Sequence, residues 1–244
     1  MGAVFLGPRI GKYGPDGKPR AIPGHNVGFA VVGVFVLWFG WFGFNAGSEL
    51  AMDNWVAHCI MTTLLAGSAG VVGAGAAIWR KTGAMDVGMA GNGALAGLVS
   101  ITAGTGTMSF PGAVAVGFIG GVIVVYSVLF IERKGIDDPV GAVSVHGVCG
   151  AWGTLAIGLF ARYDDAFLGR EDAGLFYGGG FDQLLVQAIG VVVVAVWVLG
   201  TSAILFKVLK STVGLRVSAE EELAGLDVAE HGSPGYGPEP VLVG

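Results

Sequence analysis

Long apolar stretches alternate along the chain with short polar segments. A helix that crosses a bilayer needs about 20 mostly apolar residues, because the hydrocarbon core is about 30 Å thick. By that standard the pattern predicts about six crossing helices. They are Val27 to Ser48, Trp55 to Trp79, Val87 to Ala103, Gly112 to Ile131, Pro139 to Ala161, and Leu184 to Phe206. We therefore expect an all-α fold, a polytopic membrane helix bundle.

Gly, Pro and Asp residues set two boundaries between the predicted spans. The third and fourth spans form one uncharged run, which we divide at Gly104 to Gly112 (GTGTMSFPG), since Gly and Pro punctuate helices. For the fifth span we expect Asp138 to cap the helix and Pro139 to take its first position.

Lys and Arg are unevenly distributed between alternate connections. The basic residues that fall on one side are Arg9, Lys12, Lys18, Arg20, Arg80, Lys81, Arg133, Lys134, Lys207, Lys210 and Arg216. The other side carries Glu49 and Asp53 in one turn and a longer loop after Ala161 in which acidic residues outnumber basic ones. By the positive-inside rule, both termini are predicted to be cytoplasmic in a multi-pass cell-membrane protein.

The chain divides into a membrane domain, residues 1–209, and a cytoplasmic tail, residues 210–244. The tail begins with SAEEELAGLD, which suits a short polar helix at the membrane surface, and its Gly/Pro remainder is expected to be disordered. The sequence leaves two interpretations of this tail open: a regulatory contact, and a solvated end without a role.

Composition supports a membrane location and narrows the classes of function. Hydrophobic residues make up 53% of the chain and charged residues 13%, against about 25% charged in an average soluble domain. The net charge of -5 gives no reason to expect a nucleic-acid partner. Cys59 and Cys149 both fall in apolar spans, where they are expected to be small buried side chains.

His146 stands alone in an uncharged apolar span, DDPVGAVSVHGVCGAWGTLAIGLFA. Titratable groups are expensive in hydrocarbon, so they face a protein interior or a wet path. A neutral imidazole both donates and accepts hydrogen bonds, which suits a small polar solute or proton transfer. A buried histidine satisfied by a carbonyl of a neighbouring helix is an equally weighted alternative.

The first span carries an aromatic stripe at helical spacing, formed by Trp38 and Trp41 and continued by Asn45 and Ser48 at its outer end. Aromatic faces bind desolvated cations, but Trp also collects at membrane interfaces as an anchor. From the pattern alone the anchor is the leading interpretation. His58 and His25 are interpreted as packing or interface residues, and His231 as solvated.

The sequence contains no arrangement typical of catalysis. Paired intramembrane carboxylates, Cys/His metal spacings, a nucleophile elbow and a Walker-type loop are all missing from it. We therefore expect no enzyme activity, no cofactor and no metal site.

Three segments, in order, resemble the ammonium transporter (Amt) family: PGHNVGFAVVGVFVLWFGWFGFNAGS (23–48), DDPVGAVSVHGVCGAWGTLAIGLFA (137–161) and TVGLRVSAEEELAGLD with the following HG (212–232). Members of that family have eleven transmembrane helices, of which ten form two inverted repeats, and they assemble as trimers with a pore in each subunit. This chain resembles helices six to eleven. The orientation that the Lys and Arg residues predict agrees with the orientation of those helices in the family.

The resemblance implies roles for four positions. His146 resembles one of the two pore histidines, and Trp41 the pore-lining tryptophan beside them. Phe44 resembles one of the stacked phenylalanines of the outer gate, and Ser48 the serine that helps to recruit ammonium. The second histidine, the second gating phenylalanine and the tryptophan and aspartate of the recruitment site belong to helices that have no counterpart here.

We therefore expect a fragment, or one half of a split protein, that forms part of an ammonium pore. Its partners would be ammonium or ammonia, membrane lipid, other copies in a homotrimer of the complete protein, and a PII-type regulator at the tail. An ammonium-sensing scaffold whose tail binds such a regulator is the alternative. A channel for another small neutral gas is a third interpretation.

Overall fold

The computed structural model describes residues 1–162 and 173–236. Within them five helices are long and apolar enough to cross a membrane. They are α2 (Val27–Gly47), α3 (Asn54–Thr82), α5 (Phe110–Arg133), the continuous helix of η1 (Val143–Val148) and α6 (Cys149–Phe160), and α7 (Asp182–Thr212). The short helices in the described part are α1 (Gly2–Leu6), η2 (Leu175–Tyr177), α8 (Ala219–Ala224) and α9 (Leu226–His231). The predicted polytopic helix bundle is confirmed.

The remaining predicted span is a shorter apolar helix, α4 (Val87–Thr102). Its 16 residues extend about 24 Å at 1.5 Å per residue, less than the hydrocarbon thickness. The division from α5 falls where the Gly and Pro residues indicate, because Ser109 accepts a hydrogen bond from the backbone of Gly112 and proline lies in the first turn of α5.

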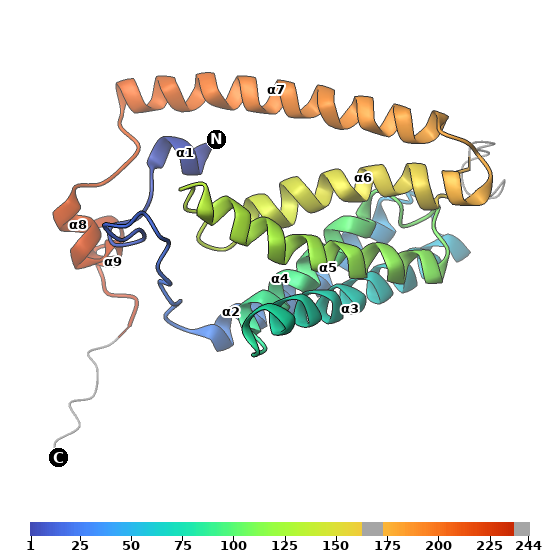
Figure 1. Cartoon of the computed structure of the whole chain (residues 1–244), viewed down its shortest axis with the longest axis horizontal. Helices are drawn as coiled ribbons and strands as arrows, with labels where there is room; N and C mark the ends of the chain where they lie inside the picture. The colour runs from blue at the N-terminus through green and yellow to red at the C-terminus, as the bar shows by residue number, and fades with distance from the viewer. Residues whose placement is uncertain (163–172, 237–244) are drawn as a thin grey trace, which may run out of the picture.

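Helices α3, α4 and α5 form the close-packed centre of the bundle (Figure 1). Their backbones approach so closely that a Cβ atom added to Gly121 would lie 2.1 Å from the carbonyl oxygen of Gly70. One added to Gly117 would lie 2.2 Å from that of Ala66. The glycines in these spans therefore serve helix packing, since only a residue without a side chain permits such contact.

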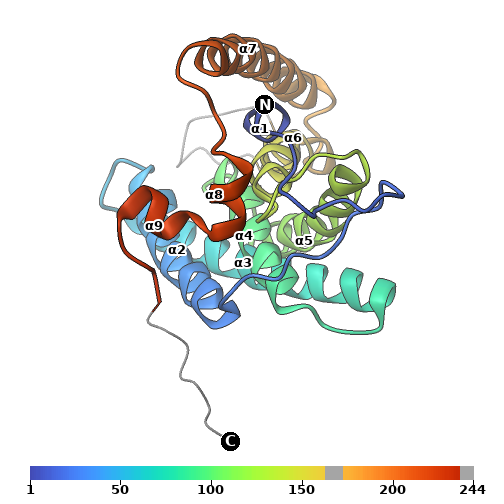
Figure 2. The same ribbon diagram turned by 90° about the vertical axis from the view of Figure 1, so that its left-hand side faces the viewer.

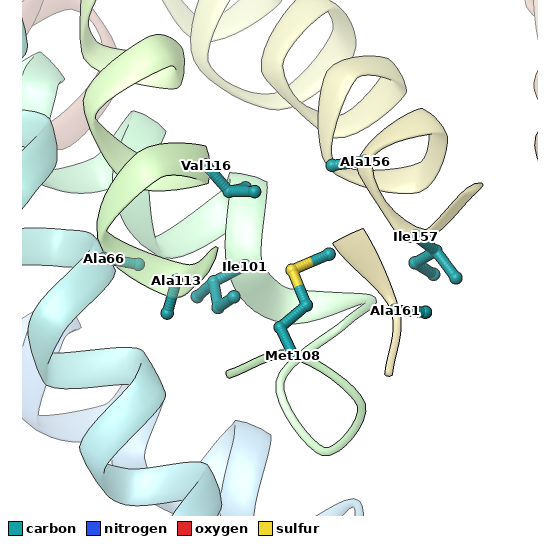
Figure 3. Close-up of a cluster of buried hydrophobic side chains, with 8 residues drawn as sticks. All are labelled: Ala66, Ile101, Met108, Ala113, Val116, Ala156, Ile157 and Ala161. Atoms are coloured by element: carbon teal, nitrogen blue, oxygen red, sulfur yellow. The ribbon is translucent and has the colours of Figure 1, made fainter. Parts of the chain in front are cut away.

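An apolar cluster closes one end of this centre (Figure 3). It consists of Ala66, Ile101, Met108, Ala113, Val116, Ala156, Ile157 and Ala161. Met108 comes from the α4–α5 connection and is fully buried, and its backbone bridges to Ala161 at the end of α6. The cluster thus joins the helix that carries His146 to α3, α4 and α5.

Helices α2 and α7 lie at the periphery, and no residue in the most apolar window of either is buried. Helix α7 runs as a long rod beside α6 in Figure 1. Its first turn fits closely there, since a Cβ added to Gly158 would lie 2.3 Å from Cα of Leu184. The acidic loop expected between α6 and α7 falls on residues 163–172, outside the described residues.

The N-terminal segment, the loop after α5 and the tail meet at one end of the bundle (Figures 1 and 2). The Lys/Arg distribution places these three segments on the same side, and their contacts confirm that they share it. The predicted polar helix of the tail is α8, which Ser218 and Glu221 begin with a reciprocal capping box. The end of the tail predicted to be disordered includes residues 237–244, which lie outside the described residues.

The start of the His146 helix differs from the prediction. Pro139 lies in a turn, and regular helix begins only after Gly141, whose φ of +74° is a left-handed conformation that glycine adopts readily. Asp138 still acts as a cap, because its carboxylate accepts from the amides of Ala142 at 3.0 Å and Val143 at 2.8 Å. Pro139 at the first helical position was therefore wrong, whereas the capping role of Asp138 is confirmed.

Candidate functional site

His146 lies in the π-helical turn η1, which runs directly into α6. Short π-helical turns are rare and occur frequently at functional sites. The residues that face inward fix this turn: Val145 and Cys149 are buried, and the buried hydroxyl of Ser144 lies 2.8 Å from that of Ser127 on α5. His146 itself is exposed.

The exposure of His146 changes the balance between the two sequence interpretations. Its ring is exposed and has no hydrogen-bond partner among the described residues, so no carbonyl of these helices caps it. A titratable side chain at this depth is costly toward lipid. The exposed face of η1 is therefore suited to contact with protein or water rather than hydrocarbon.

Trp41 fixes the C-terminal half of α2 against the bundle. Its indole Nε1 donates to Thr102 Oγ1 at 2.8 Å, and Thr102 in turn donates to the carbonyl of Leu98 at 2.7 Å. The ring of Trp41 meets that of Phe44 edge to face, with centroids 6.0 Å apart and an interplanar angle of 74°. Phe44 thus has a defined position although 57% of it is exposed.

Ser48 is exposed just beyond the end of α2. Its hydroxyl donates to the carbonyl of Phe44 at 2.6 Å. A hydroxyl that has used its proton still has acceptor lone pairs, and a cation such as ammonium offers only donors. Ser48 keeps acceptor lone pairs and the Phe44 ring is exposed, and both groups have the chemistry that attracts a small cationic donor.

Asn45 lies in a different environment from the polar mouth that the sequence pattern assigns to it. It is 2% exposed, and its amide Nδ2 donates to Thr63 Oγ1 at 2.9 Å. Thr63 donates to the carbonyl of Cys59, and Thr105 from the α4–α5 connection donates to the same carbonyl. Asn45 thus belongs to a buried polar network between α2, α3 and that connection.

The aromatic stripe is correspondingly split. A Cβ on Gly67 of α3 would lie 2.7 Å from the Trp38 ring, so this glycine makes room for the indole. Trp38, Trp41 and Asn45 therefore face α3 and α4, and only Ser48 remains at an outer mouth. Both tryptophans contact protein, which favours a pore-wall position, and the membrane-anchor interpretation of this stripe stays a prediction.

The hydroxyl residues of this network were missed by sequence reasoning. Thr62, Thr63 and Thr105 are buried in or beside apolar spans. Their place in apolar segments could have predicted a hydrogen-bond network, because buried hydroxyls need partners. The ion pairs between the N-terminal segment and the α5–η1 loop were also missed.

The weaker histidines fit the roles expected from the sequence. His58 Nε2 lies 3.0 Å from the carbonyl of Met108, and its ring stacks on Phe110. His25 meets Tyr236 edge to face, and His231 is exposed at the end of α9. Within residues 1–162 and 173–236, no cluster of His, Cys, Asp and Glu has the grouping that a metal ion needs.

These features define a polytopic α-helical membrane protein in which one helix presents an exposed histidine and another an aromatic pair and a hydroxyl. The two elements, η1 and α2, both pack against α4. The model of the Ammonium Transporter Family matches residues 1–236, and this chain belongs to that family.

Known relatives cover nearly the whole chain. Ammonium transporter Amt2 of Archaeoglobus fulgidus is 49% identical over 238 residues, which are 96% of this chain and 50% of that protein. Ammonium transporter Amt2 of Methanocaldococcus jannaschii is 40% identical over 99% of this chain and 54% of its own length.

Solved structures show the same fold. A structure described as a sensor Amt protein matches with a TM-score of 0.86 and 41% identity, over 94% of this chain and 55% of that one. The Saccharomyces cerevisiae Mep2 structure matches with a TM-score of 0.79 and 29% identity, over 90% of this chain and 50% of that one. The chain thus spans about half the length of the relatives it matches.

Proposed function

We propose that this chain supplies one half of a pore that conducts ammonium as ammonia. Family membership supports ammonium as the substrate. The chain spans about half the length of its relatives, which supports its role as one half of the pore. The single observation that carries the proposal is the exposed His146 on its π-helical turn. A polar conduit beside its ring would explain this exposure, because hydrocarbon is a costly neighbour for an imidazole.

In the proposed mechanism, ammonium first meets Ser48 and the face of Phe44. The hydroxyl accepts a hydrogen bond from the cation, and the ring attracts it through its quadrupole. Trp41 holds Phe44 in place and lines the path inward. A bare cation pays a large desolvation penalty in an apolar pore, so transfer of its proton near Phe44 allows neutral ammonia to pass.

His146 then forms hydrogen bonds with the neutral ammonia. An imidazole accepts with one ring nitrogen and donates with the other, so it replaces water contacts that ammonia has lost. The same two nitrogens also suit a proton relay toward a second titratable group. That group would lie on helices from the other half, supplied by the same longer polypeptide or by another chain.

Uptake of labelled methylammonium by cells that carry the complete pore tests this role. We expect His146→Ala to change the rate, its pH dependence or its selectivity. His25→Ala is the matched control, because His25 lies ahead of α2 and its ring meets that of the tail residue Tyr236. An unchanged rate, pH profile and selectivity in His146→Ala would remove His146 from the path.

The proposal of a half-pore has its own experiment. The chain alone, reconstituted in liposomes, is expected to give no ammonium-dependent flux, whereas the chain with the complementary helices gives flux. Flux through the chain alone would contradict the half-pore. Competition by ammonium against another small neutral gas decides whether the pore is selective for ammonium.

Assembly, topology and domain division follow from the same proposal. The complete protein is proposed to be a homotrimer, with both termini of this chain in the cytoplasm and a division between residues 1–209 and 210–244. Mass measurement in nanodiscs tests the trimer. Labelling of a single cysteine introduced at Lys18, with a reagent that does not cross the membrane, tests the orientation.

A PII-type regulator at the tail is the proposed cytoplasmic partner. The tail offers α8 and α9, which are exposed and lie beside the N-terminal segment. If the protein is an ammonium-sensing scaffold, this contact is its main output. Co-purification of the regulator with the chain, compared with a variant that lacks residues 210–244, tests the contact.

A further inference from the structure

The turn that carries His146 is held at its start by two neighbouring carboxylates with different partners. Asp138 caps the first amides of the helix, as described above. Asp137 binds a different segment, and its side chain is only 2% exposed. Buried carboxylates are usually paired, because an unpaired charge out of water is costly.

The partner of Asp137 is Arg9, which lies 128 residues earlier in the chain. The guanidinium donates from Nε to Oδ2 at 2.8 Å and from Nη2 to Oδ1 at 2.9 Å. The backbone amide of Arg9 adds a third hydrogen bond to Oδ2 at 3.0 Å. This bidentate fork fixes the carboxylate in orientation as well as in position, since both partners are planar.

The same N-terminal segment also holds the end of α5. Lys12, which is 5% exposed, pairs with the carboxylate of Glu132, and the hydroxyl of Tyr13 donates to the Glu132 carbonyl at 3.0 Å. Residues 9–13 therefore contact both sides of the loop that joins α5 to η1. The position of that loop sets where η1 begins.

The π-helical turn depends on its anchors more than an α-helical turn does. Its hydrogen bonds are less favourable, which is why such turns stay short and persist only where surroundings fix them. On the bundle side, the Ser144 and Ser127 hydroxyls hold it. On the side of the N-terminal segment, the anchor is Asp138, whose neighbour Asp137 is held by Arg9.

We infer that Arg9 is a positioning residue for His146, acting through Asp137 on the start of η1. The segment before α2 then belongs to the conduction machinery and is more than a connector. This inference rests on the proposed function only for its effect on transport. Its structural part is testable on the chain itself.

Amide hydrogen exchange, followed by mass spectrometry on the chain in lipid nanodiscs, tests the structural part. Arg9→Ala is expected to speed exchange in residues 139–148 by about tenfold or more, while α3 stays protected. Lys18→Ala is the matched control, because Lys18 lies in the same segment and its ion pair in the described part of the chain is with its exposed neighbour Asp16. Unchanged exchange in residues 139–148 would overturn the inference, and so would an equal rise over the whole bundle.

Two further variants guard against simple misfolding. Arg9→Lys keeps the charge but loses the fork, so an intermediate exchange rate is expected. The exchanged pair, Arg9→Asp with Asp137→Arg, is expected to restore protection of residues 139–148 relative to either single variant. Failure of the exchanged pair to improve on both singles would contradict a direct action through Asp137.

Transport gives a second and separable readout. In cells carrying the complete pore, Arg9→Ala is expected to lower the maximal rate of methylammonium uptake about tenfold at equal protein in the membrane, with recovery in the exchanged pair. If the unaltered protein does not transport, the proposed function fails while the exchange experiment still decides the inference. If it transports and Arg9→Ala does so equally well, the inference fails alone.

Discussion

Trp41 of α2 and Thr102 of α4 are joined by a hydrogen bond of 2.8 Å between indole Nε1 and Oγ1. Thr102→Val keeps the shape of the side chain but removes the acceptor, which leaves a partly buried indole N–H without a partner. Such a loss costs about 1–3 kcal/mol. We expect a drop of that size in the free energy of unfolding, measured by reversible denaturation in mixed micelles.

Thr102→Ser is the matched control, because it retains the hydroxyl. It should lose less than half as much stability as Thr102→Val. Equal losses in the two variants would show that the methyl group, and not the hydrogen bond, holds Trp41 in place.

A second prediction concerns the backbone contact between α5 and α3. Gly121→Ala places a methyl group 2.1 Å from the carbonyl oxygen of Gly70, so the two helices must separate. Overpacking of this kind costs about 1–3 kcal/mol or more. Thermal unfolding in detergent should show a clearly lower midpoint.

Gly190→Ala is the comparison for this experiment, since a Cβ at Gly190 meets nothing within 4 Å. Alanine restricts the unfolded chain more than glycine does, so this variant should be neutral or slightly more stable. A loss in Gly190→Ala as large as in Gly121→Ala would mean that any alanine in these helices is harmful.

The third prediction is a pH dependence from Asp137. The hydrogen bonds from Arg9 lower the pKa of this carboxyl below its ordinary value of 3.8. A lowered folded-state pKa means that the pair stabilises the protein above about pH 4 and that this contribution disappears as pH falls through the lowered pKa. Because Arg9 is partly exposed, we expect Asp137→Asn to cost roughly 1–3 kcal/mol at pH 7.

Unfolding measured from pH 7 to pH 3 checks this dependence. The difference between the unaltered chain and Asp137→Asn should narrow toward the acid end, since the protonated carboxyl and the amide are both neutral. A constant difference over the whole range would show that the charge of Asp137 does not cause the loss.

A fourth prediction concerns how the tail is held. Arg216 pairs with Glu222 at 2.7 Å and donates to the carbonyl of Leu6 at 3.1 Å, while Glu222 accepts from the amide of Ile10 at 2.8 Å. Both groups are partly exposed, so Arg216→Ala should leave the overall free energy of unfolding nearly unchanged. Limited proteolysis of residues 213–231 should nevertheless become several-fold faster, because the tail loses its contacts with the N-terminal segment.

Glu230→Gln on the exposed helix α9 serves as the control for proteolysis. It removes a nearby charge without touching Arg216 or Glu222. If both variants are cleaved at the same rate as the unaltered chain, the ion pair does not hold the tail.

The sequence predicts the helices well because their signal is local. The apolar runs locate α2, α3, α5, α6 and α7, and the Gly and Pro residues locate the break before Phe110. Burial of Cys59 and Cys149 as free thiols also follows from their apolar surroundings. The resemblance of the motifs identified the family, which the family model confirms over residues 1–236.

Features that depend on partners far away in the sequence could not be predicted from local sequence patterns. The environment of Asn45 is set by Thr63 and that of Arg9 by Asp137, and helical periodicity does not identify either partner. The displaced helix start after Pro139 depends on the left-handed turn at Gly141, whose surroundings come from Asn92 and Val128 on other helices. The π-helical turn likewise reflects packing that a single-residue pattern does not encode.

The contacts of the N-terminal segment also bear on how the molecule is made. A ribosome delivers Arg9 128 residues before Asp137, and Ile10 212 residues before Glu222. In the proposed orientation Arg9 remains in the cytoplasm during that interval, where its positive charge opposes translocation of this flank of the chain. Closure of this end of the bundle is therefore completed only when α7 and the following segment that carries Glu222 have been synthesised.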